Sequence, residues 1–322
     1  MNTEQKTYDL SLVIPVYNES DNIEPLAGMI DASLKNTPLN YEVIFIDDGS
    51  DDGSCEILKK ICNSRTNYKL IRFRKNFGQT AAIAAGFDYA TGKIIITLDS
   101  DLQNDPKDIP ALLKKMDEGY DVVSGWRSKR QDNPITRNFP SAIANWIIGI
   151  ATGVKLHDYG CTLKAYRREI IKDVCLYGEL HRFIPALASF EGASIGEMPV
   201  KHHARIHGKS KYNLSKTWRV LLDLLTVSFL RRYQTRPLHI FGRIGLTSFF
   251  IGFVISAYLT FQKLIYHIQL ANRPLLILGV LLLLTGIQLI SLGIVAEMQT
   301  RTYFESQKRP IYRIKEIIGN QD

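Results

Sequence analysis

Two long apolar stretches near the end of the chain restrict its possible folds more than any other feature. They run from about Leu238 to Phe261 and from Pro274 to about Met298. Each comes close to the roughly 20 apolar residues that cross a bilayer core of about 30 Å. The second stretch is apolar on all faces, which disfavours the alternative of a buried helical hairpin in a soluble protein. We therefore predict two transmembrane helices.

The charges beside these stretches predict which side of the membrane their ends occupy. Basic residues precede the first stretch and follow the second, namely Arg231, Arg232, Arg236, Arg301, Lys308 and Arg309. The connection at 267–272 is short and carries little charge. Because basic flanks favour the cytoplasmic side, we predict that the N-terminal part of the chain and both termini are cytoplasmic.

The net charge is concentrated just before the first apolar stretch. The chain carries a formal charge of +8, and the segment from Lys201 to Arg243 alone has ten basic residues against one acid, a net charge of +9. Such a segment predicts an anionic partner. Within it, Asn213 to Leu230 has an apolar and a basic face, which is typical of a helix lying in the headgroup region. The segment adjoins membrane spans and resembles no helix-turn-helix, so we expect membrane lipids and no nucleic acid as its partner.

The first two thirds of the chain alternate short apolar runs with helical patterns. The apolar runs are Leu10 to Val16, Tyr41 to Ile46, Lys69 to Phe73, Ile94 to Leu98 and Asp121 to Ser124. Such alternation predicts βαβ units and an α/β domain with a mostly parallel sheet. Ligands of such sheets bind at the carboxyl ends of the strands. The residues that follow these runs are therefore the candidate site.

The sequence Asp99-Ser100-Asp101-Leu102-Gln103 directly follows one of these runs. Two carboxylates at i and i+2 on extended backbone point the same way. Hard divalent cations such as Mg²⁺ or Mn²⁺ take oxygen ligands, often one or two carboxylates together with substrate phosphates. We predict a divalent cation that stabilises a departing diphosphate. The alternative is a turn or helix cap, which uses the same residue types.

A second acidic group, from Asp47 to Gly53, follows another apolar run. An EF-hand loop beginning at Asp48 would need a glutamate where Lys59 stands, which excludes that reading. We predict instead that a strand-end carboxylate here accepts hydrogen bonds from a nucleobase or ribose. Asp51 and Asp52 are expected to form a solvated turn.

The sequence from His207 to Tyr212 resembles the end of a phosphate-binding P-loop. The glycine that a P-loop requires is replaced by His203, and no apolar strand precedes the loop, so that motif is excluded. What remains is a cationic loop that includes Arg205 and Lys211, suited to binding a diphosphate near the membrane.

Together these segments resemble glycosyltransferase family 2, and within it the polyisoprenyl-phosphate branch. IPVYNE, DDGSDDGS, DSDLQ, SGWR (Ser124 to Arg127) and HGKSKY occur in this order over roughly residues 10 to 215. The resemblance implies a GT-A fold, a Rossmann-like α/β architecture with a mostly parallel sheet, followed by two transmembrane helices. The predicted domains are a catalytic domain at 1–212, an interfacial helix and linker at 213–236, a transmembrane hairpin at 237–299 and a cytoplasmic tail at 300–322.

The resemblance also implies roles for individual residues. It places nucleotide-sugar contacts at Pro15, Tyr17, Glu19, Ile46, Asp48, Asp99, Ser100, Asp101, Gln103, Arg127, Arg205 and Lys211. Asp99, Asp101 and Gln103 would bind the metal. It makes Asp158 and Asp101 catalytic residues, with Asp158 as a base or an acceptor-orienting residue. The alternative for Asp158 is an ion pair with Arg167 or Arg168.

The implied reaction is an inverting transfer of one sugar to a polyisoprenyl phosphate, undecaprenyl phosphate in a bacterial inner membrane. UDP-glucose is the expected donor, with GDP-mannose, UDP-modified arabinose and UDP-N-acetylated sugars as alternatives. Processive family members carry a QxxRW motif that this chain lacks. A homo-oligomer such as a tetramer is expected. The competing functions are a nucleotide-sugar-binding subunit without turnover and a lipid-sugar transporter, for which two spans form a poor pathway.

Overall fold

The computed structural model describes two compact units of the chain. One consists of Met1–Ser228 with Pro310–Asp322, and the other of Phe229–Arg309. The residues described within them are 8–35, 37–128, 145, 148–150, 152–172, 174, 176, 178, 180–203, 238–266, 274–306 and 310–319. The predicted interfacial helix, Arg205 and Lys211 lie outside these ranges, so those predictions stay as they are, together with the domain boundaries that depend on them.

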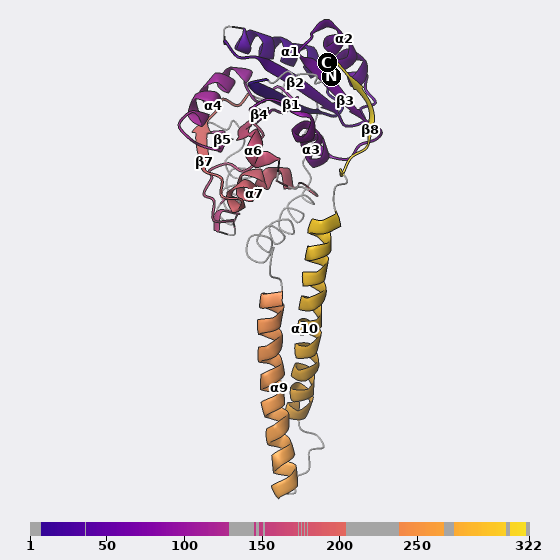
Figure 1. The fold of residues 1–322 in the computed structure, drawn as a ribbon, viewed down its shortest axis with the longest axis vertical. Coiled ribbons are helices and arrows are strands. Elements are labelled where there is room, and N and C mark those ends of the chain that lie inside the picture. Colours follow the sequence, from indigo (N-terminus) through magenta and orange to yellow (C-terminus); the bar gives the residue numbers. More distant parts are fainter. Residues whose placement is uncertain are drawn as a thin grey trace, which may run out of the picture. The chain divides into compact units, whose positions relative to one another are not determined.

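The first unit is an α/β domain built on one sheet (Figure 1). Its strands are β1 (Leu10–Val16), β2 (Tyr41–Asp47), β3 (Tyr68–Phe73), β4 (Ile94–Thr97), β5 (Val122–Trp126), β6 (Lys164–Arg167), β7 (Ile195–Pro199) and β8 (Ile314–Ile318). Its helices are α1 (Ser20–Leu34), α2 (Ser54–Ser64), α3 (Gln79–Tyr89), η1 (Pro106–Asp108), α4 (Ile109–Met116), α6 (Arg168–Ile171), η3 (Leu180–Phe183) and α7 (Ile184–Phe190). The five apolar runs of the sequence correspond to β1 to β5, within two residues at either end.

The sheet has the strand order β7-β5-β6-β4-β1-β2-β3-β8. Strands β6 and β8 run antiparallel to their neighbours, and the other pairings are parallel. Helices α1, α2 and α4 cover one face with a buried apolar cluster, and α3 and α7 cover the other. The predicted mostly parallel α/β sheet is therefore confirmed. It places the carboxyl ends of β1, β2 and β4 at one edge, where ligands of such sheets bind.

The last strand, β8, belongs to this sheet although it follows the second apolar helix in the chain. It pairs with β3 in the register Arg72↔Glu316, and the Glu316 carboxylate receives the Arg72 Nη1 at 3.1 Å and the Lys59 Nζ at 2.8 Å. Tyr312, just before it, stacks on Phe73 with ring centroids 5.2 Å apart. The strand lies within the segment 300–322, for which the sequence predicts a cytoplasmic tail and no strand.

We predict that Tyr312→Ala destabilises the first unit by about 3 kcal/mol, because it removes a buried aromatic ring. The melting temperature of the detergent-solubilised chain should then fall by about 8 °C. Tyr312→Phe removes only the hydrogen bond from its hydroxyl to Asp88 Oδ2 (2.7 Å) and should cost about 1 kcal/mol. Ile311→Ala, at an exposed neighbour, is the control. A wild-type melting temperature in Tyr312→Ala would show that the packing of Tyr312 on Phe73 does not stabilise the first unit.

The second unit contains two long helices, α9 (Leu238–Tyr266) and α10 (Pro274–Ser306). By length and composition they are apolar enough to cross a membrane, with mean hydropathies of 1.8 over Phe241–Tyr266 and 2.6 over Pro274–Ala296. Most of their large apolar side chains are exposed, which is costly in water and favourable in lipid. The two predicted apolar helices are therefore present.

Glycines spaced by seven residues bring α9 and α10 into close contact. A Cβ added to Gly245 would lie 2.9 Å from the Gly286 carbonyl oxygen, and one added to Gly252 would lie 2.7 Å from the Gly279 carbonyl oxygen. Moving seven residues forward on α9 thus moves seven back on α10, as in an antiparallel pair. Small residues permit this approach of backbones. These glycines pack within the chain, so they give no support to the predicted homo-oligomer, which stays a prediction.

Candidate active site

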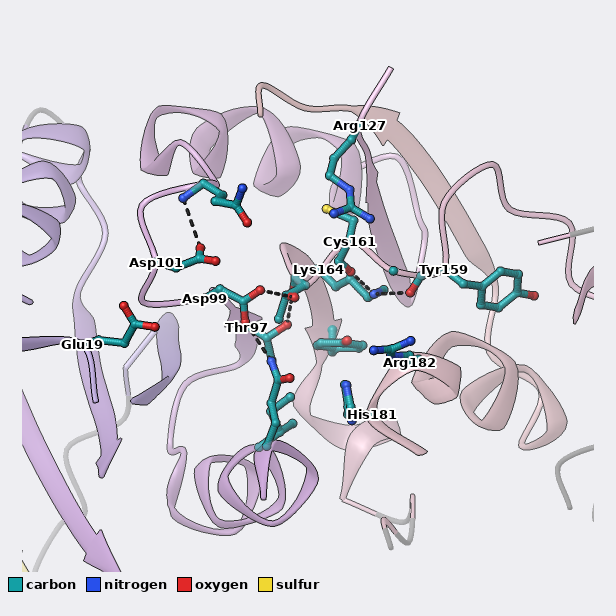
Figure 2. A pocket seen from close by; sticks show the side chains of 16 residues that line it. Glu19, Thr97, Asp99, Asp101, Arg127, Tyr159, Cys161, Lys164, His181 and Arg182 are labelled. Carbon is teal, nitrogen blue, oxygen red and sulfur yellow. Dashed lines mark hydrogen bonds between the residues drawn. The ribbon is translucent and has the colours of Figure 1, made fainter. Parts of the chain in front are cut away.

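A pocket of about 240 Å³ opens at the carboxyl ends of β1 and β4 (Figure 2). Five residues singled out from the sequence line it together: Glu19, Asp99, Asp101, Gln103 and Arg127. Its other lining residues are Gln79, Ile83, Thr97, Tyr159, Gly160, Cys161, Thr162, Lys164, Tyr166, His181 and Arg182. The strand-end edge predicted from the alternation of apolar runs is therefore the place where these side chains meet.

Asp99 and Asp101 stand at the end of β4, where the chain leaves the sheet. The two Asp99 carboxylate oxygens accept hydrogen bonds from the Gln79 Nε2 at 2.8 Å and the Thr162 Oγ1 at 2.5 Å. Asp101 accepts the Gln103 backbone N–H at 3.2 Å. Leu102 between them has φ 60°, a left-handed conformation that is rare for a branched side chain. Such strain is characteristic of functional loops.

The negative charge of Asp101 disfavours ionisation of Asp99. Burial raises the pKa of Asp99, and the neighbouring Asp101 raises it further. A divalent cation would remove this repulsion. Among the described residues no group of three or more His, Cys, Asp or Glu side chains is arranged to hold a metal. Two carboxylates completed by substrate phosphates fit a Mg²⁺ or Mn²⁺ site, because these ions accept diphosphate oxygens and water as ligands.

Some of the predicted nucleotide contacts are accessible to a ligand, and others are buried. Glu19 lines the pocket, and its Oε2 accepts a hydrogen bond from Asn22 Nδ2 at 2.6 Å. Tyr17 is 37% exposed and accessible to a ligand, and Pro15 is half-buried within β1. Ile46 is wholly buried in the apolar cluster under α3, so that only its backbone is available to a nucleotide. Ser100 is buried beside Asp101.

The turn after β2 is held more firmly than the sequence indicated. Asp52 accepts hydrogen bonds from the backbone N–H of Ser20 and Ser54, each at 3.0 Å, and from the Ser54 hydroxyl. It thereby joins the starts of α1 and α2, while Asp51 and Asp52 are both exposed, in agreement with the predicted solvated turn. Ser54 is the first residue of α2.

Asp48 connects this turn to the loop between β3 and α3. Its two oxygens accept the backbone N–H groups of Phe77 at 2.6 Å and Gly78 at 2.9 Å. Gln79, which contacts Asp99, is the next residue in the chain. Burial raises the pKa of Asp48 to about 6, with Asp47 adding to the effect and the two N–H groups opposing it. Asp48 is therefore ionised at pH 7 and protonated at pH 5.

We predict that binding of uridine, which carries no phosphate, weakens as the pH falls through about 6. The ionised Asp48 carboxylate holds the loop and is the predicted acceptor from the base, so the affinity should follow its ionised fraction and drop about tenfold between pH 7 and pH 5. Asp48→Asn should bind weakly and independently of pH. Saturation-transfer NMR with uridine measures both. A wild-type affinity that is constant from pH 5 to 7 would contradict this role.

Arg127 and Asp158 form a two-point ion pair beneath the pocket. The Arg127 Nε lies 2.6 Å from Asp158 Oδ2, and its Nη2 lies 2.9 Å from Asp158 Oδ1. Burial opposes the charge on Arg127, but the carboxylate outweighs it and raises the pKa of the guanidinium. Asp158 is 1% exposed and also accepts the Gly160 N–H at 3.0 Å. Arg127 reaches the pocket, while Asp158 lies behind it.

These contacts bear on both roles considered for Asp158. An ion pair exists, but with Arg127 rather than with Arg167 or Arg168, and Arg167 instead faces Asp121 at 3.5 Å. A carboxylate whose two oxygens receive a guanidinium and a backbone N–H is arranged to hold Arg127 in place. The predicted role of Asp158 as a base stays a prediction.

The polar pocket residues that were not singled out from the sequence include Gln79, Thr162, Lys164, His181 and Arg182. Lys164 had a detectable signal, since a lysine within the short apolar run Leu163 to Tyr166 is unusual for a buried strand. His181 and Arg182 belong to η3 and carry no local motif. His181 is placed by a 2.8 Å contact of its Nδ1 with the Thr80 hydroxyl on α3.

The fold is shared with solved glycosyltransferase structures. Glucosyl-3-phosphoglycerate synthase from Mycobacterium tuberculosis, in complex with Mn²⁺ and UDP-glucose, superposes with a TM-score of 0.53 at 19% identity, covering 70% of this chain and 79% of that one. The domain therefore has the predicted GT-A fold.

Relatives of similar length extend this result over the whole chain. Residues 11–175 match the family described as glycosyl transferase family 2. The dodecaprenyl-phosphate galacturonate synthase of Rhizobium johnstonii is 45% identical over 99% of this chain and 96% of its own length. The undecaprenyl-phosphate 4-deoxy-4-formamido-L-arabinose transferase of Proteus mirabilis is 37% identical over 99% and 97%. The chain belongs to glycosyltransferase family 2.

Proposed function

We propose that this glycosyltransferase moves a single galacturonate residue from a uridine diphosphate donor to a polyprenyl phosphate at a membrane surface. The observation that carries the proposal is the end-to-end similarity to the galacturonate synthase, which includes both apolar helices. The proposed donor is therefore UDP-galacturonate in place of UDP-glucose, the donor expected from the sequence. Glucose and a modified arabinose remain the alternatives to be tested beside it.

The fold supports a membrane location with the catalytic domain on one side. The chain leaves the α/β unit before α9 and returns to its sheet at β8, which pairs with β3. An antiparallel hairpin that starts and ends at one domain returns to the side of the bilayer from which it entered. Together with the basic flanks of the hairpin, this favours a cytoplasmic catalytic domain and cytoplasmic termini.

The pocket supports a direct displacement. A bound divalent cation would supply charge stabilisation to the departing diphosphate, and Asp99 and Asp101 are the side chains placed to hold it. Arg127, oriented by Asp158, presents a fixed positive charge to a phosphate group. A polyprenyl phosphate is largely ionised at neutral pH, so it needs positioning more than deprotonation.

The experiment is a donor screen with the purified full chain, undecaprenyl phosphate and Mg²⁺ or Mn²⁺. Labelled UDP-galacturonate, UDP-glucose, a UDP-modified arabinose and GDP-mannose are compared by the label that enters the lipid phase. We expect lipid-phase product with UDP-galacturonate, and none after EDTA. Product from another donor alone would overturn the galacturonate assignment, and no product from any donor would overturn the polyprenyl-phosphate reaction.

A further inference from the structure

Lys164 is a buried cation without an ionic partner in the described part of the chain. Its side chain lines the pocket yet is 2% exposed as a residue. Its Nζ donates hydrogen bonds to the backbone carbonyls of Tyr159 and Cys161, and no described carboxylate forms an ion pair with it. Burial lowers its pKa, because the charged form has lost its water. Lysine is seldom fully buried unless it is paired.

The carboxylates nearest to Lys164 are already engaged elsewhere. Asp158 is held by Arg127 at two points. Asp99 receives hydrogen bonds from Gln79 and Thr162 and is one of the two side chains placed to hold a cation. Neither is therefore available to neutralise Lys164 when the donor is bound. The third N–H of the ammonium group is left for a ligand.

Two further basic side chains line the same part of the pocket. Figure 2 shows Arg182, His181 and Lys164 on one side of Asp99, and Asp101 and Glu19 on the other. The pocket thus has an acidic end, suited to a cation and diphosphate, and a basic end. A ligand that spans it carries its own negative charge at the second end.

The sheet register places the basic end next to Asp99, where the donor diphosphate is proposed to bind. Lys164 on β6 pairs with Thr97 on β4, two residues before Asp99, and Thr162 contacts Asp99 directly. A group that reaches Lys164 would therefore lie close to a diphosphate held through a cation at Asp99 and Asp101. The donor sugar is attached to that diphosphate, which favours a charge on the sugar over a charge on the lipid acceptor.

We propose that Lys164, assisted by Arg182, binds the carboxylate of a uronic-acid donor and selects it over the neutral sugar of the same stereochemistry. The proposal rests on the proposed function, since it specifies which group of the transferred galacturonate the pocket recognises. It gives the buried ammonium a counter-ion that is present only when the donor is bound. Discrimination of this type is strong, because a neutral sugar leaves the buried charge unpaired.

The test compares UDP-galacturonate with UDP-galactose, which differ only at the C6 carboxylate. We measure kcat/KM for both donors, with undecaprenyl phosphate as acceptor, in the wild type, Lys164→Met and Arg182→Gln. Lys164→Met should lower kcat/KM for UDP-galacturonate by about 100-fold and change that for UDP-galactose by less than about threefold. Arg182→Gln should shift the preference in the same direction by about tenfold.

Controls separate this proposal from a structural role and from the proposed function. Lys164→Arg keeps the charge and should keep the preference for the uronate. Lys172→Met, at an exposed lysine outside the pocket, should behave as wild type. Melting temperatures show whether each variant folds. If Lys164→Met does not fold, Arg182→Gln still tests the site, because Arg182 is only half-buried.

Each other outcome counts against a defined statement. Equal losses with both donors, or a selective rise in the KM for undecaprenyl phosphate, would overturn the carboxylate subsite and leave galacturonate transfer standing. A selective rise in the KM for undecaprenyl phosphate would assign the basic end to the acceptor phosphate. A wild type that uses UDP-galactose but not UDP-galacturonate would overturn the donor assignment and the subsite together.

Discussion

Asp101→Asn is expected to lower kcat/KM for the sugar nucleotide by about 1,000-fold, the size of effect that follows loss of a group stabilising transition-state charge. The Asp101 carboxylate lines the pocket beside Asp99 at the end of β4. An asparagine of the same shape keeps the loop, in which Asp101 accepts the Gln103 N–H. It removes one of the two negative charges that a divalent cation requires here.

A second readout identifies the cause of this loss. Calorimetry of UDP binding with and without Mn²⁺ should show a strong metal dependence in the wild type and little in Asp101→Asn. Asp117→Asn, at an exposed acid after α4, is the matched control and should retain both activity and metal dependence. Full metal-dependent UDP binding by Asp101→Asn would remove this residue from the metal site.

The strands that could be predicted from the sequence are those whose information is local. β1 to β5 are short apolar runs bounded by turn residues, and a buried parallel strand requires such a run. β6 is only four residues long and begins and ends with a charged residue, and β8 follows the second apolar helix, so the alternation of apolar runs and helices predicts neither strand. β8 is also paired with a strand about 240 residues earlier, and the Glu316 contacts that hold it exist only after the chain has returned from the apolar hairpin.

The candidate site divides in the same way. Asp99, Asp101 and Gln103 follow one strand and belong to one motif, so their proximity could be inferred before the fold was known. Lys164 and Arg182 reach the same pocket from β6 and η3, which no local pattern connects with β4. The predicted partners of Asp158, Arg167 and Arg168, are close to it in the sequence, whereas the observed partner Arg127 precedes it by 31 residues. Tertiary contacts supplied what the motifs could not.

A double-mutant cycle on Arg127 and Asp158 has the second largest expected effect. Asp158→Asn leaves the guanidinium with a neutral neighbour and should lower kcat by about 100-fold, because Arg127 loses its fixed orientation toward the pocket. If Asp158 acts through Arg127, then Arg127→Gln and the double variant should be impaired to about the same extent as Asp158→Asn. Effects of residues that act as one unit do not add.

Stability and pH dependence distinguish this positioning role from that of a general base. Removing one partner of a buried ion pair costs about 3 kcal/mol, and removing both restores much of it. The double variant should therefore recover stability without recovering activity. A base would behave differently: Asp158→Asn would abolish the acidic limb of the pH profile of kcat, and Arg127→Gln would add a separate loss. Because Arg127 donates to both oxygens of Asp158 and the Gly160 N–H donates to Oδ1, we expect the pH profile to keep its shape while its height falls.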